Sequence, residues 1–273
     1  MRRRDHHLNR LDRNFIIGTL KQVAREAGLL YGDEPRDYKG RRVTAEGILG
    51  TALSPHCVEV IRATAAYASG PKILDLGIGY GIYDVVLSRF FDFEVCGIEH
   101  PNNISAYARF PIKQGISVRA CDLHCDPLPL GEKTFDTVIA SEVVEHLFIS
   151  PKALFSKSSL ALKRGGRLVV TTPNFLSLRK IFILLKGLNP AAPFPDEEFS
   201  AGGVIQDPRV HPREYTPREI RKALVDSGFQ IVAIHTMIDR AASGVRFRSR
   251  VMKTLMRLLP GHGDRIVAIG EKA

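Results

Sequence analysis

Lys72-Ile-Leu-Asp-Leu-Gly-Ile-Gly-Tyr-Gly81 is the stretch of sequence that decides the fold. Its first five residues are mostly apolar, which predicts a buried β-strand that ends just before Gly77. Gly77, Gly79 and Gly81 follow at alternate positions. Because glycine has no Cβ atom, these residues let the backbone turn tightly and approach a ligand closely. The stretch therefore predicts a strand that leads into a ligand-binding loop.

Three acidic residues accompany this loop and narrow the kind of ligand it can take. The G-x-G-x-G spacing differs from the G-x-G-x-x-G of dinucleotide-binding loops, and Asp75 precedes the first glycine by two residues. A carboxylate there suits a cationic or hydroxyl-rich ligand better than a pyrophosphate. Glu99 closes the next predicted strand, where it can accept hydrogen bonds from ribose hydroxyls. Asp122 and Leu123 follow the third strand and suit an adenine amino group and ring.

Short β-branched runs alternate with helical patterns from about residue 70 onward. Helical patterns separate the first five runs, which is typical of βαβ units and a parallel sheet. The last two runs follow a longer interruption and could add an antiparallel edge. The predicted strands are Lys72–Leu76, Glu94–Ile98, Ser117–Ala120, Thr137–Ala140, Arg167–Thr171, Gln230–Ile234 and Arg265–Ile269.

Three segments lie outside this alternation. Residues 1–70 predict a helical N-terminal extension. The domain that follows covers residues 71–273 and carries inserts at 175–210 and 240–260. Ile16, Leu20 and Val23 are spaced for one helix face. The apolar run Phe175–Leu188 predicts a helix that is either a lid or a packed core helix. Residues 246–259 predict a basic amphipathic helix, whose charges fit anionic lipid, nucleic acid or simply solvent.

The composition is that of an ordinary globular protein. The 273 residues are 44% hydrophobic and 25% charged, which argues against disorder, collagen and coiled coil. Four cysteines (Cys57, Cys96, Cys121, Cys125) without a secretory leader argue against a disulfide scaffold, and no apolar run is long enough to cross a membrane. We therefore expect a cytoplasmic protein. The net charge of +10 favours acidic partners without selecting one.

Taken together, the glycine loop, the acid that ends the second strand and the Asp-Leu pair after the third resemble the class I S-adenosylmethionine-dependent methyltransferases. The resemblance covers about residues 70–175 and 211–235. It implies a Rossmann-like α/β fold with strand order 3-2-1-4-5-7-6 and S-adenosylmethionine at the carboxyl ends of the strands. The residues it implies for cofactor binding are Asp75, Gly77, Gly79, Gly81, Glu99, Asp122, Leu123 and Ser141.

A possible metal site follows the fourth strand, in Ser141-Glu-Val-Val-Glu-His-Leu147. If a helix begins there, Glu142, Glu145 and His146 share one face, and His211 from a later segment could supply a fourth ligand. Two carboxylates and two imidazoles suit Mn²⁺, Co²⁺, Fe²⁺ or Zn²⁺ better than Mg²⁺. Acids are also favoured in the first turn of any helix, so a polar active-site edge without metal is the alternative.

The segment Phe135–His146 resembles that of ubiquinone-biosynthesis O-methyltransferases. Glu142, Glu145 and His146 also resemble a motif of the small-RNA 2′-O-methyltransferases, together with Thr172-Pro-Asn174, His211, Glu214 and Thr216. In those families the matching residues bind a divalent ion, with the later histidine doing so in the RNA enzymes. Without a metal, His146 or His211 could act as general base beside Glu145.

Cys121, His124 and Cys125 carry possible zinc ligands but supply too few of them on their own, which favours a loop without metal. The function predicted overall is O-methylation of a small or glycan-like metabolite. An RNA ribose 2′-O-methyltransferase and a non-catalytic cofactor-binding partner protein are the alternatives. An anionic membrane surface is a further possible partner, and the sequence gives no oligomeric state.

Overall fold

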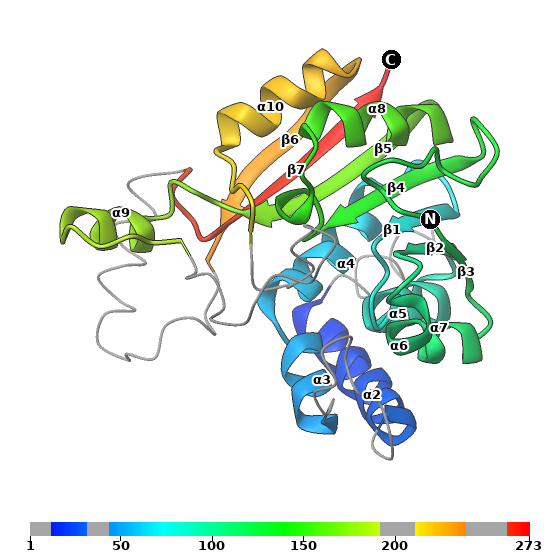
Figure 1. Cartoon of the computed structure of the whole chain (residues 1–273). Coiled ribbons are helices and arrows are strands. Elements are labelled where there is room, and N and C mark those ends of the chain that lie inside the picture. The colour runs from blue at the N-terminus through cyan, green and yellow to red at the C-terminus, as the bar shows by residue number, and fades with distance from the viewer. Residues whose placement is uncertain (1–11, 32–43, 192–210, 239–260) are drawn as a thin grey trace.

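The computed structural model describes residues 12–31, 44–191, 211–238 and 261–273. Its centre is a seven-stranded sheet of order β3-β2-β1-β4-β5-β7-β6, which confirms the predicted order (Figure 1). Strands β1 to β5 are parallel to one another, and β7 runs antiparallel to both β5 and β6, in agreement with the antiparallel edge considered from the sequence. The strands are β1 Lys72–Leu76, β2 Glu94–Glu99, β3 Ser117–Ala120, β4 Phe135–Ser141, β5 Leu162–Pro173, β6 Phe229–Met237 and β7 Arg265–Lys272.

Helices cover both faces of this sheet. One face carries α4 and α5, and the other carries α8 and α10, which also contact each other (Figure 1). The helices are α2 Arg13–Tyr31, α3 Ala45–Ala52, α4 Pro55–Tyr67, α5 Ile82–Phe91, α6 Ile104–Tyr107, α7 Arg109–Lys113, the 3₁₀ helix η1 Val144–His146, α8 Pro151–Ala161, α9 Leu178–Leu185 and α10 Pro217–Asp226.

The alternation of side chains along β1 explains the two helical layers. Ile73 packs into the apolar cluster formed with α2 to α5, whereas Leu74 and Leu76 pack into the cluster formed with α8 and α10. All three side chains are fully buried. Successive residues of a strand point to opposite faces, so a strand with apolar residues on both faces must lie between two layers.

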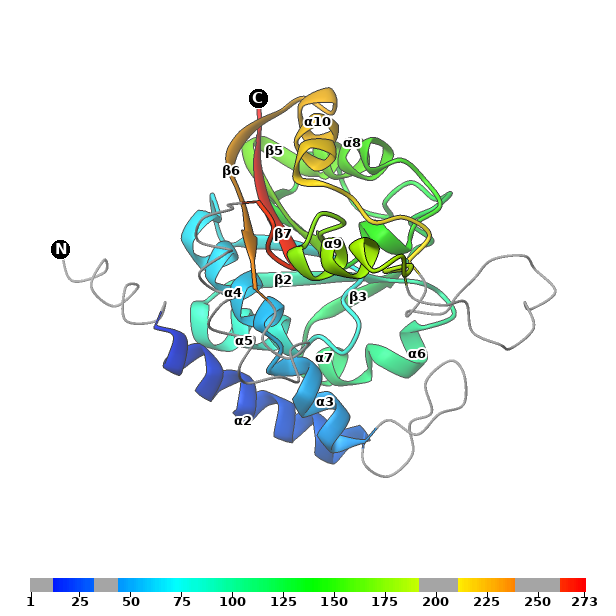
Figure 2. The same cartoon turned by 90° about the vertical axis from the view of Figure 1, so that its left-hand side faces the viewer.

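The N-terminal helices α2 and α3 lie side by side along the edge of the molecule (Figure 2). The predicted face of α2 is buried, because Ile16, Leu20 and Val23 have no exposed surface. At the end of α2, the hydroxyl of Tyr31 donates to the carbonyl of Tyr107 and accepts the backbone N–H of Phe110 at 3.0 Å. These bonds fasten α2 to the region of α6 and α7.

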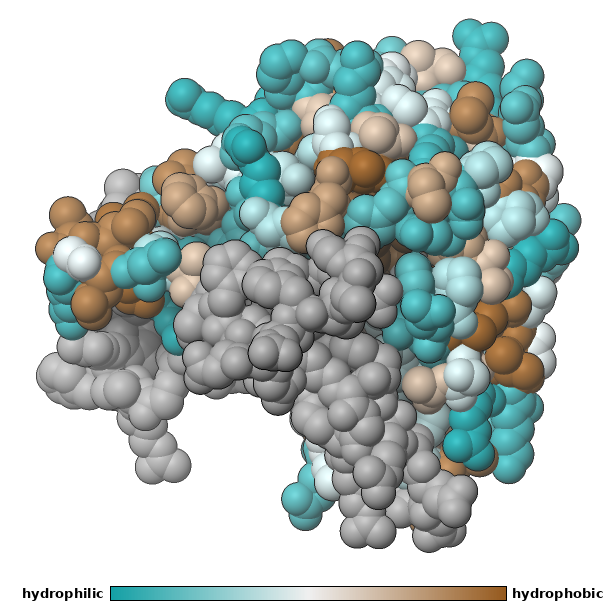
Figure 3. All heavy atoms as spheres, viewed as in Figure 1, coloured by the Kyte–Doolittle hydropathy of each residue, from teal (hydrophilic) through white to brown (hydrophobic). Residues whose placement is uncertain are grey.

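Helix α9 is shorter than the predicted Phe175–Leu188 and lies at the surface. Its N-cap is Ser177, whose side chain accepts from the backbone N–H of Lys180. Of its own residues only Leu178 is buried, and apolar side chains gather over its outer surface (Figure 3). The interpretation of α9 as a packed core helix is therefore wrong. The basic helix predicted over 246–259, with Arg246, Arg250, Lys253 and Arg257, lies outside the described residues, as does the part of the 175–210 insert from residue 192 onward. Among the described helices, none is long and apolar enough to cross a membrane.

Candidate active site

The three glycines of the loop after β1 have different reasons to be glycine. Gly77, Gly79 and Gly81 all have positive φ values, of 80°, 53° and 61°. A Cβ at Gly77 would lie 2.8 Å from Val143, and one at Gly81 would lie 2.6 Å from Pro111. At both positions the neighbouring side chain of the protein already occupies the space that a Cβ would need. A Cβ at Gly79 would meet nothing within 4 Å. The space beside Gly79 is thus open to a ligand.

Glu99 ends β2 next to this loop and is 7% exposed. One carboxylate oxygen accepts the backbone N–H of Gly79 at 2.8 Å, and the other accepts that of His100 at 2.9 Å. Burial raises the pKa of Glu99, and the two backbone hydrogen bonds oppose that effect. The carboxylate therefore joins the end of β2 directly to the glycine loop.

Asp75 lies at the same edge and is fully buried. The hydroxyl of Tyr83 donates to one of its oxygens at 2.7 Å, while the other oxygen has no hydrogen-bond partner among the described residues. Burial raises the pKa of Asp75 to about 7. Asp84 is equally buried. Its pKa is raised by that burial and also by repulsion from the nearby Asp75 carboxylate. Two buried acids with unused acceptor oxygens suit a ligand that brings a positive charge.

Asp122 and Leu123 follow β3 at the neighbouring position. Asp122 accepts hydrogen bonds from the backbone N–H and the ring Nδ1 of His124, both at 2.9 Å, and lies 3.8 Å from the ring of His100. Leu123 is buried. Cys121 and Cys125 instead contact the carbonyl of Pro127 and the carboxylate of Asp126. Within the described ranges these cysteines join no cluster of possible metal ligands.

The helix predicted to begin after Ser141 does not form. The backbone N–H of Glu142 donates to the carbonyl of Thr171 at 2.9 Å, so the pairing of β4 with β5 continues past Ser141. Glu142 then takes a left-handed conformation, with φ of 55°, and only the short η1 follows. Its carboxylate pairs with Arg265 and accepts from the hydroxyl of Thr171 at 3.1 Å. Ser141 shares a 2.8 Å hydrogen bond with the same hydroxyl.

Three of the four expected metal ligands come together without Glu142. One ligand atom each from Glu145, His146 and His211 lies within 4.8 Å of the other two. Glu145 is 1% exposed, and one of its oxygens accepts from the hydroxyl of Thr172 at 2.9 Å. Its other oxygen is buried with no hydrogen-bond partner among the described residues. The set of donors, one carboxylate and two imidazoles, suits a divalent transition-metal ion.

The protonation states of this cluster follow from its burial. Burial raises the pKa of Glu145 to about 7. Burial, together with the nearby His146 and Lys180, lowers the pKa of His211 to about 4, so its imidazole is neutral at neutral pH. The rings of His146 and His211 pack edge to face with their centroids 4.8 Å apart. A neutral imidazole is the form that binds a metal ion or accepts a proton.

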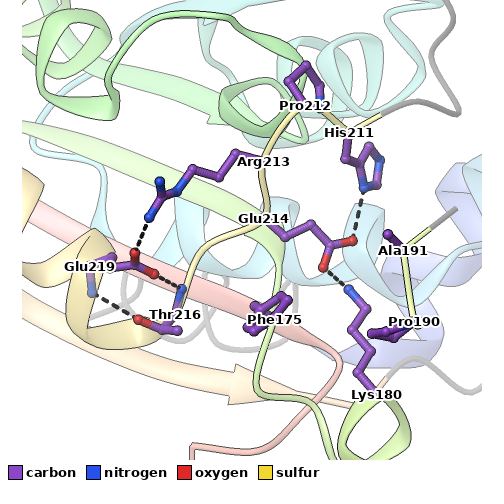
Figure 4. A pocket seen from close by; sticks show the side chains of 10 residues that line it. All are labelled: Phe175, Lys180, Pro190, Ala191, His211, Pro212, Arg213, Glu214, Thr216 and Glu219. Atoms are coloured by element: carbon purple, nitrogen blue, oxygen red, sulfur yellow. Dashed lines mark hydrogen bonds and ion pairs between the residues drawn. The ribbon is translucent and has the colours of Figure 1, made fainter. Parts of the chain in front are cut away.

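A pocket of about 470 Å³ opens beside His211 (Figure 4). It lies between α9 and the segment before α10, which Thr216 and Glu219 fix with a capping box. In this pocket the carboxylate of Glu214 reaches both His211 and Lys180. The residues that line this pocket include Phe175, Lys180, Pro190, His211, Pro212, Arg213 and Glu214.

Tyr83, Asp84 and Lys180 belong to the site but are absent from the sequence-based prediction. Tyr83 donates to Asp75, Asp84 lies beside Asp75, and Lys180 bonds to Glu214 next to His211. Thr172 and Glu214 enter the prediction only through the family resemblance, and the structure places them against Glu145 and His211. No local signal marks Lys180, because it is one of two cations on an apolar helix.

Comparison with known proteins identifies the family. A model of the methyltransferase domain matches residues 55–234. Phosphoethanolamine N-methyltransferase 1 of Triticum aestivum is 26% identical over 207 residues, which cover 73% of this chain and 36% of the relative. The mitochondrial ubiquinone biosynthesis O-methyltransferase of Rattus norvegicus is 28% identical over 183 residues, or 64% of this chain and 49% of the relative. The chain thus spans between about a third and a half of these relatives.

Solved structures agree at the level of the fold. A SAM-dependent methyltransferase from Archaeoglobus fulgidus aligns with a TM-score of 0.54 at 19% identity, covering 79% of this chain and 92% of its own. With the family match, the glycine loop and the 3-2-1-4-5-7-6 sheet, this confirms the resemblance stated from the sequence. The chain belongs to the methyltransferase-domain family and has the fold of the class I S-adenosylmethionine-dependent methyltransferases.

Proposed function

We propose that this enzyme methylates an oxygen atom of a small or glycan-like metabolite and that Glu145, His146 and His211 hold a divalent ion that assists the reaction. The observation that carries the proposal is the cluster of these three side chains beyond the carboxyl end of β4. One buried oxygen of Glu145 has no hydrogen-bond partner among the described residues and lies 4.0 Å from Nε2 of His146, which supports an ion between them, since a buried acceptor is costly unless something binds it.

At the cofactor-binding edge of the sheet, each acidic residue binds a different part of the cofactor in this proposal. Asp75 takes the ammonium group of the cofactor, Glu99 the ribose hydroxyls, and Asp122 with Leu123 the adenine. The open space beside Gly79 supports this placement, as do the unused oxygens of the Asp75 carboxylate and its neighbour. Gly77 and Gly81 shape the loop, and Ser141 lies at the rim where the cofactor and the acceptor meet.

The chemistry demands alignment and an activated nucleophile. Methyl transfer is an in-line displacement, so holding the acceptor oxygen opposite the sulfonium methyl supplies much of the rate. Glu145, His146 and His211 would hold a divalent ion, which would lower the pKa of an acceptor hydroxyl and fix its approach. Without an ion, His146 or His211 takes the proton as general base.

The pocket beside His211 supplies an acceptor site of mixed character. Phe175, Pro190 and Pro212 give it apolar walls, while Lys180, Arg213 and Glu214 add polar groups. Such walls suit a ring or sugar with hydroxyl groups. The names of the relatives include both an N- and an O-methyltransferase. Oxygen is favoured here because β4 ends in Ala140-Ser-Glu rather than in the Asn-Pro-Pro-Tyr loop typical of exocyclic-amine methylation.

The segments around the sheet set the choice of acceptor in this proposal. Helix α2 of the N-terminal extension 1–70 reaches the cofactor loop, because the ring of Tyr31 packs against that of Tyr80 with centroids 5.3 Å apart. The inserts 175–210 and 240–260 belong in this proposal to the same domain of residues 71–273. Helix α9 then acts as a lid over the pocket, because Lys180 of this helix and Phe175 just before it line the cavity.

RNA is the second candidate acceptor, favoured by the net charge of +10. The deciding experiment supplies methyl-labelled cofactor with metabolite, glycan, lipid and RNA fractions, with and without chelator. We expect label in the metabolite or glycan fraction and its loss with chelator. Label confined to RNA would contradict the choice of acceptor. In that case RNA affinity should fall by about 0.7 log units per phosphate contacted for each tenfold rise in salt concentration. The residues to neutralise are then Arg246, Arg250, Lys253 and Arg257.

A further inference from the structure

The carboxylate of Glu214 lies between two partners that come from different parts of the chain (Figure 4). One oxygen is 3.1 Å from Nδ1 of His211, and the other accepts a hydrogen bond from Nζ of Lys180. The side chains of Glu214 and Lys180 are 16% and 17% exposed. Because each oxygen has its own partner in a mostly buried setting, the orientation of the carboxylate is fixed.

Hydrogen bonds also fix the backbone around Glu214. The next residue, Tyr215, forms a bridge with Asn174, and its carbonyl accepts the N–H of Phe175 at 3.0 Å. Thr216 then caps α10. The segment that carries His211 and Glu214 is therefore anchored to the end of β5 on one side and to a helix on the other.

The contact with Glu214 decides which nitrogen of His211 carries the proton. An ionised carboxylate has no hydrogen to donate, so its hydrogen bond with the ring requires a proton on Nδ1. The neutral imidazole has one proton, and Nε2 is left with its lone pair. A metal ion needs an unprotonated nitrogen, and the same lone pair serves a general base.

We infer that Glu214 is a positioning residue that fixes the Nδ1-protonated tautomer of His211, and that Lys180 of α9 holds Glu214 in place for this purpose. The inference rests on the proposed role of His211 as an ion ligand or base, and it adds two residues to that site. It also gives the insert after β5 a direct link to the reacting centre, since Lys180 lies in the first turn of α9.

The first test measures the tautomer without any ion. Long-range ¹H–¹⁵N correlation spectra of chelator-treated protein report which nitrogen of each histidine is protonated, and His211→Gln assigns the signals of His211. We expect the Nδ1-protonated form in the natural protein and in Lys180→Arg. Glu214→Ala should give a mixture with the Nε2-protonated form, and Lys180→Met should give a smaller change of the same kind. An unchanged tautomer in Glu214→Ala would overturn the inference.

The second test measures ion affinity by calorimetry with Co²⁺. Groups that orient a metal-binding histidine change the affinity by about 10- to 100-fold, so Glu214→Ala should lose that much. Affinity for S-adenosylhomocysteine should stay within about twofold, as for a site with no shared partner. Equal affinity for Co²⁺ in Glu214→Ala and the natural protein would contradict the link between Glu214 and the ion.

Glu59→Gln is the matched control, because Glu59 of α4 contacts His235 of β6 at 3.3 Å, and neither residue lines the pocket or joins the ligand cluster. It should change neither the His211 tautomer nor the Co²⁺ affinity. The two tests also separate this inference from the proposed function. If the natural protein binds no Co²⁺ but the tautomer still changes in Glu214→Ala, the ion site fails while the role of Glu214 stands. Thermal unfolding of each variant identifies any that fails to fold, and Lys180→Met then provides the decisive comparison.

Discussion

The carboxylate of Glu99 accepts a hydrogen bond from the backbone N–H of Gly79, with 2.8 Å between the two atoms. Glu99 ends β2 and Gly79 is the middle glycine of the loop after β1, so one side chain joins the two elements that flank the cofactor site. The bond occupies one oxygen of a carboxylate that is expected to bind ribose. Its energetic role can be measured directly.

Glu99→Ala should weaken the binding of S-adenosylhomocysteine by about 1.5–3 kcal/mol, roughly a 10- to 150-fold loss, because hydrogen bonds to a charged group are removed. Glu94→Ala is the control, since Glu94 begins the same strand and its side chain is 71% exposed. Calorimetry should show no change for this control. Equal affinity in the two variants would refute the role of Glu99.

Gly79→Val and Gly81→Val should fail in different ways. A side chain at Gly79 enters open space, so it should block the cofactor. The left-handed backbone at this position should lower the free energy of unfolding by about 1–2 kcal/mol when valine replaces glycine. A side chain at Gly81 strikes Pro111 and should destabilise the fold further. Thermal unfolding and cofactor titration distinguish the two. Normal cofactor affinity in a folded Gly79→Val protein would contradict the assignment.

Cofactor affinity should rise with pH. Burial raises the pKa of Asp75 to about 7, so its carboxyl becomes negatively charged as the pH passes that value. A cationic ammonium prefers the charged form, and we expect about a tenfold gain in affinity for S-adenosylhomocysteine between about pH 6 and about pH 8. Without ligand, pH acts in the opposite direction on the free energy of unfolding, which falls as the pH rises. The raised pKa contributes stability at low pH, and this is lost as the pH rises through about 7.

Variants at this site assign the pH effect. Asp75→Asn should flatten the pH dependence of both binding and unfolding. Tyr83→Phe should move the binding profile to higher pH, because the Tyr83 hydroxyl stabilises the charged carboxylate. Asp226→Asn, on an exposed residue, serves as control. A pH profile that persists in Asp75→Asn would assign the titration to another group.

Ion dependence should follow the observed cluster rather than the four-residue set expected from the sequence. Chelator should suppress turnover, and Mn²⁺ or Co²⁺ should restore it. His211→Ala should lower ion affinity by more than about 100-fold, beyond the effect of an outer residue. Glu142→Gln should leave it within about twofold, because Glu142 bonds to Arg265 and Thr171 instead. Full activity of a protein shown by elemental analysis to be metal-free would leave the histidines as general bases.

Two leucines of α9 should differ in their effect on stability. Leu178 is 6% exposed, and Leu178→Ala should lower the free energy of unfolding by about 2–5 kcal/mol. Leu185 is 77% exposed, and Leu185→Ala should change it by less than about 0.5 kcal/mol. Denaturant unfolding measures both. A large loss in Leu185→Ala would mean that this surface is buried in solution.

The sequence by itself determined the sheet and the edge where chemistry occurs. The apolar run before Gly77 and the acids Asp75 and Glu99 follow local rules of strand formation and turn geometry. The carboxyl ends of parallel strands meet at one edge, so residues near those ends had to come together. The order of the strands and the antiparallel β7 were predictable because the motif set resembles one family.

Tertiary structure alone decided the composition of the cluster. Glu142, Glu145 and His146 are close in sequence, yet the N–H of Glu142 pairs with Thr171 of a neighbouring strand, which prevents the expected helix. Glu142 then meets Arg265 from the last strand. Lys180 and Glu214 likewise meet only because α9 folds against the segment before α10. Such contacts depend on packing between distant segments, and no local pattern of residues encodes them.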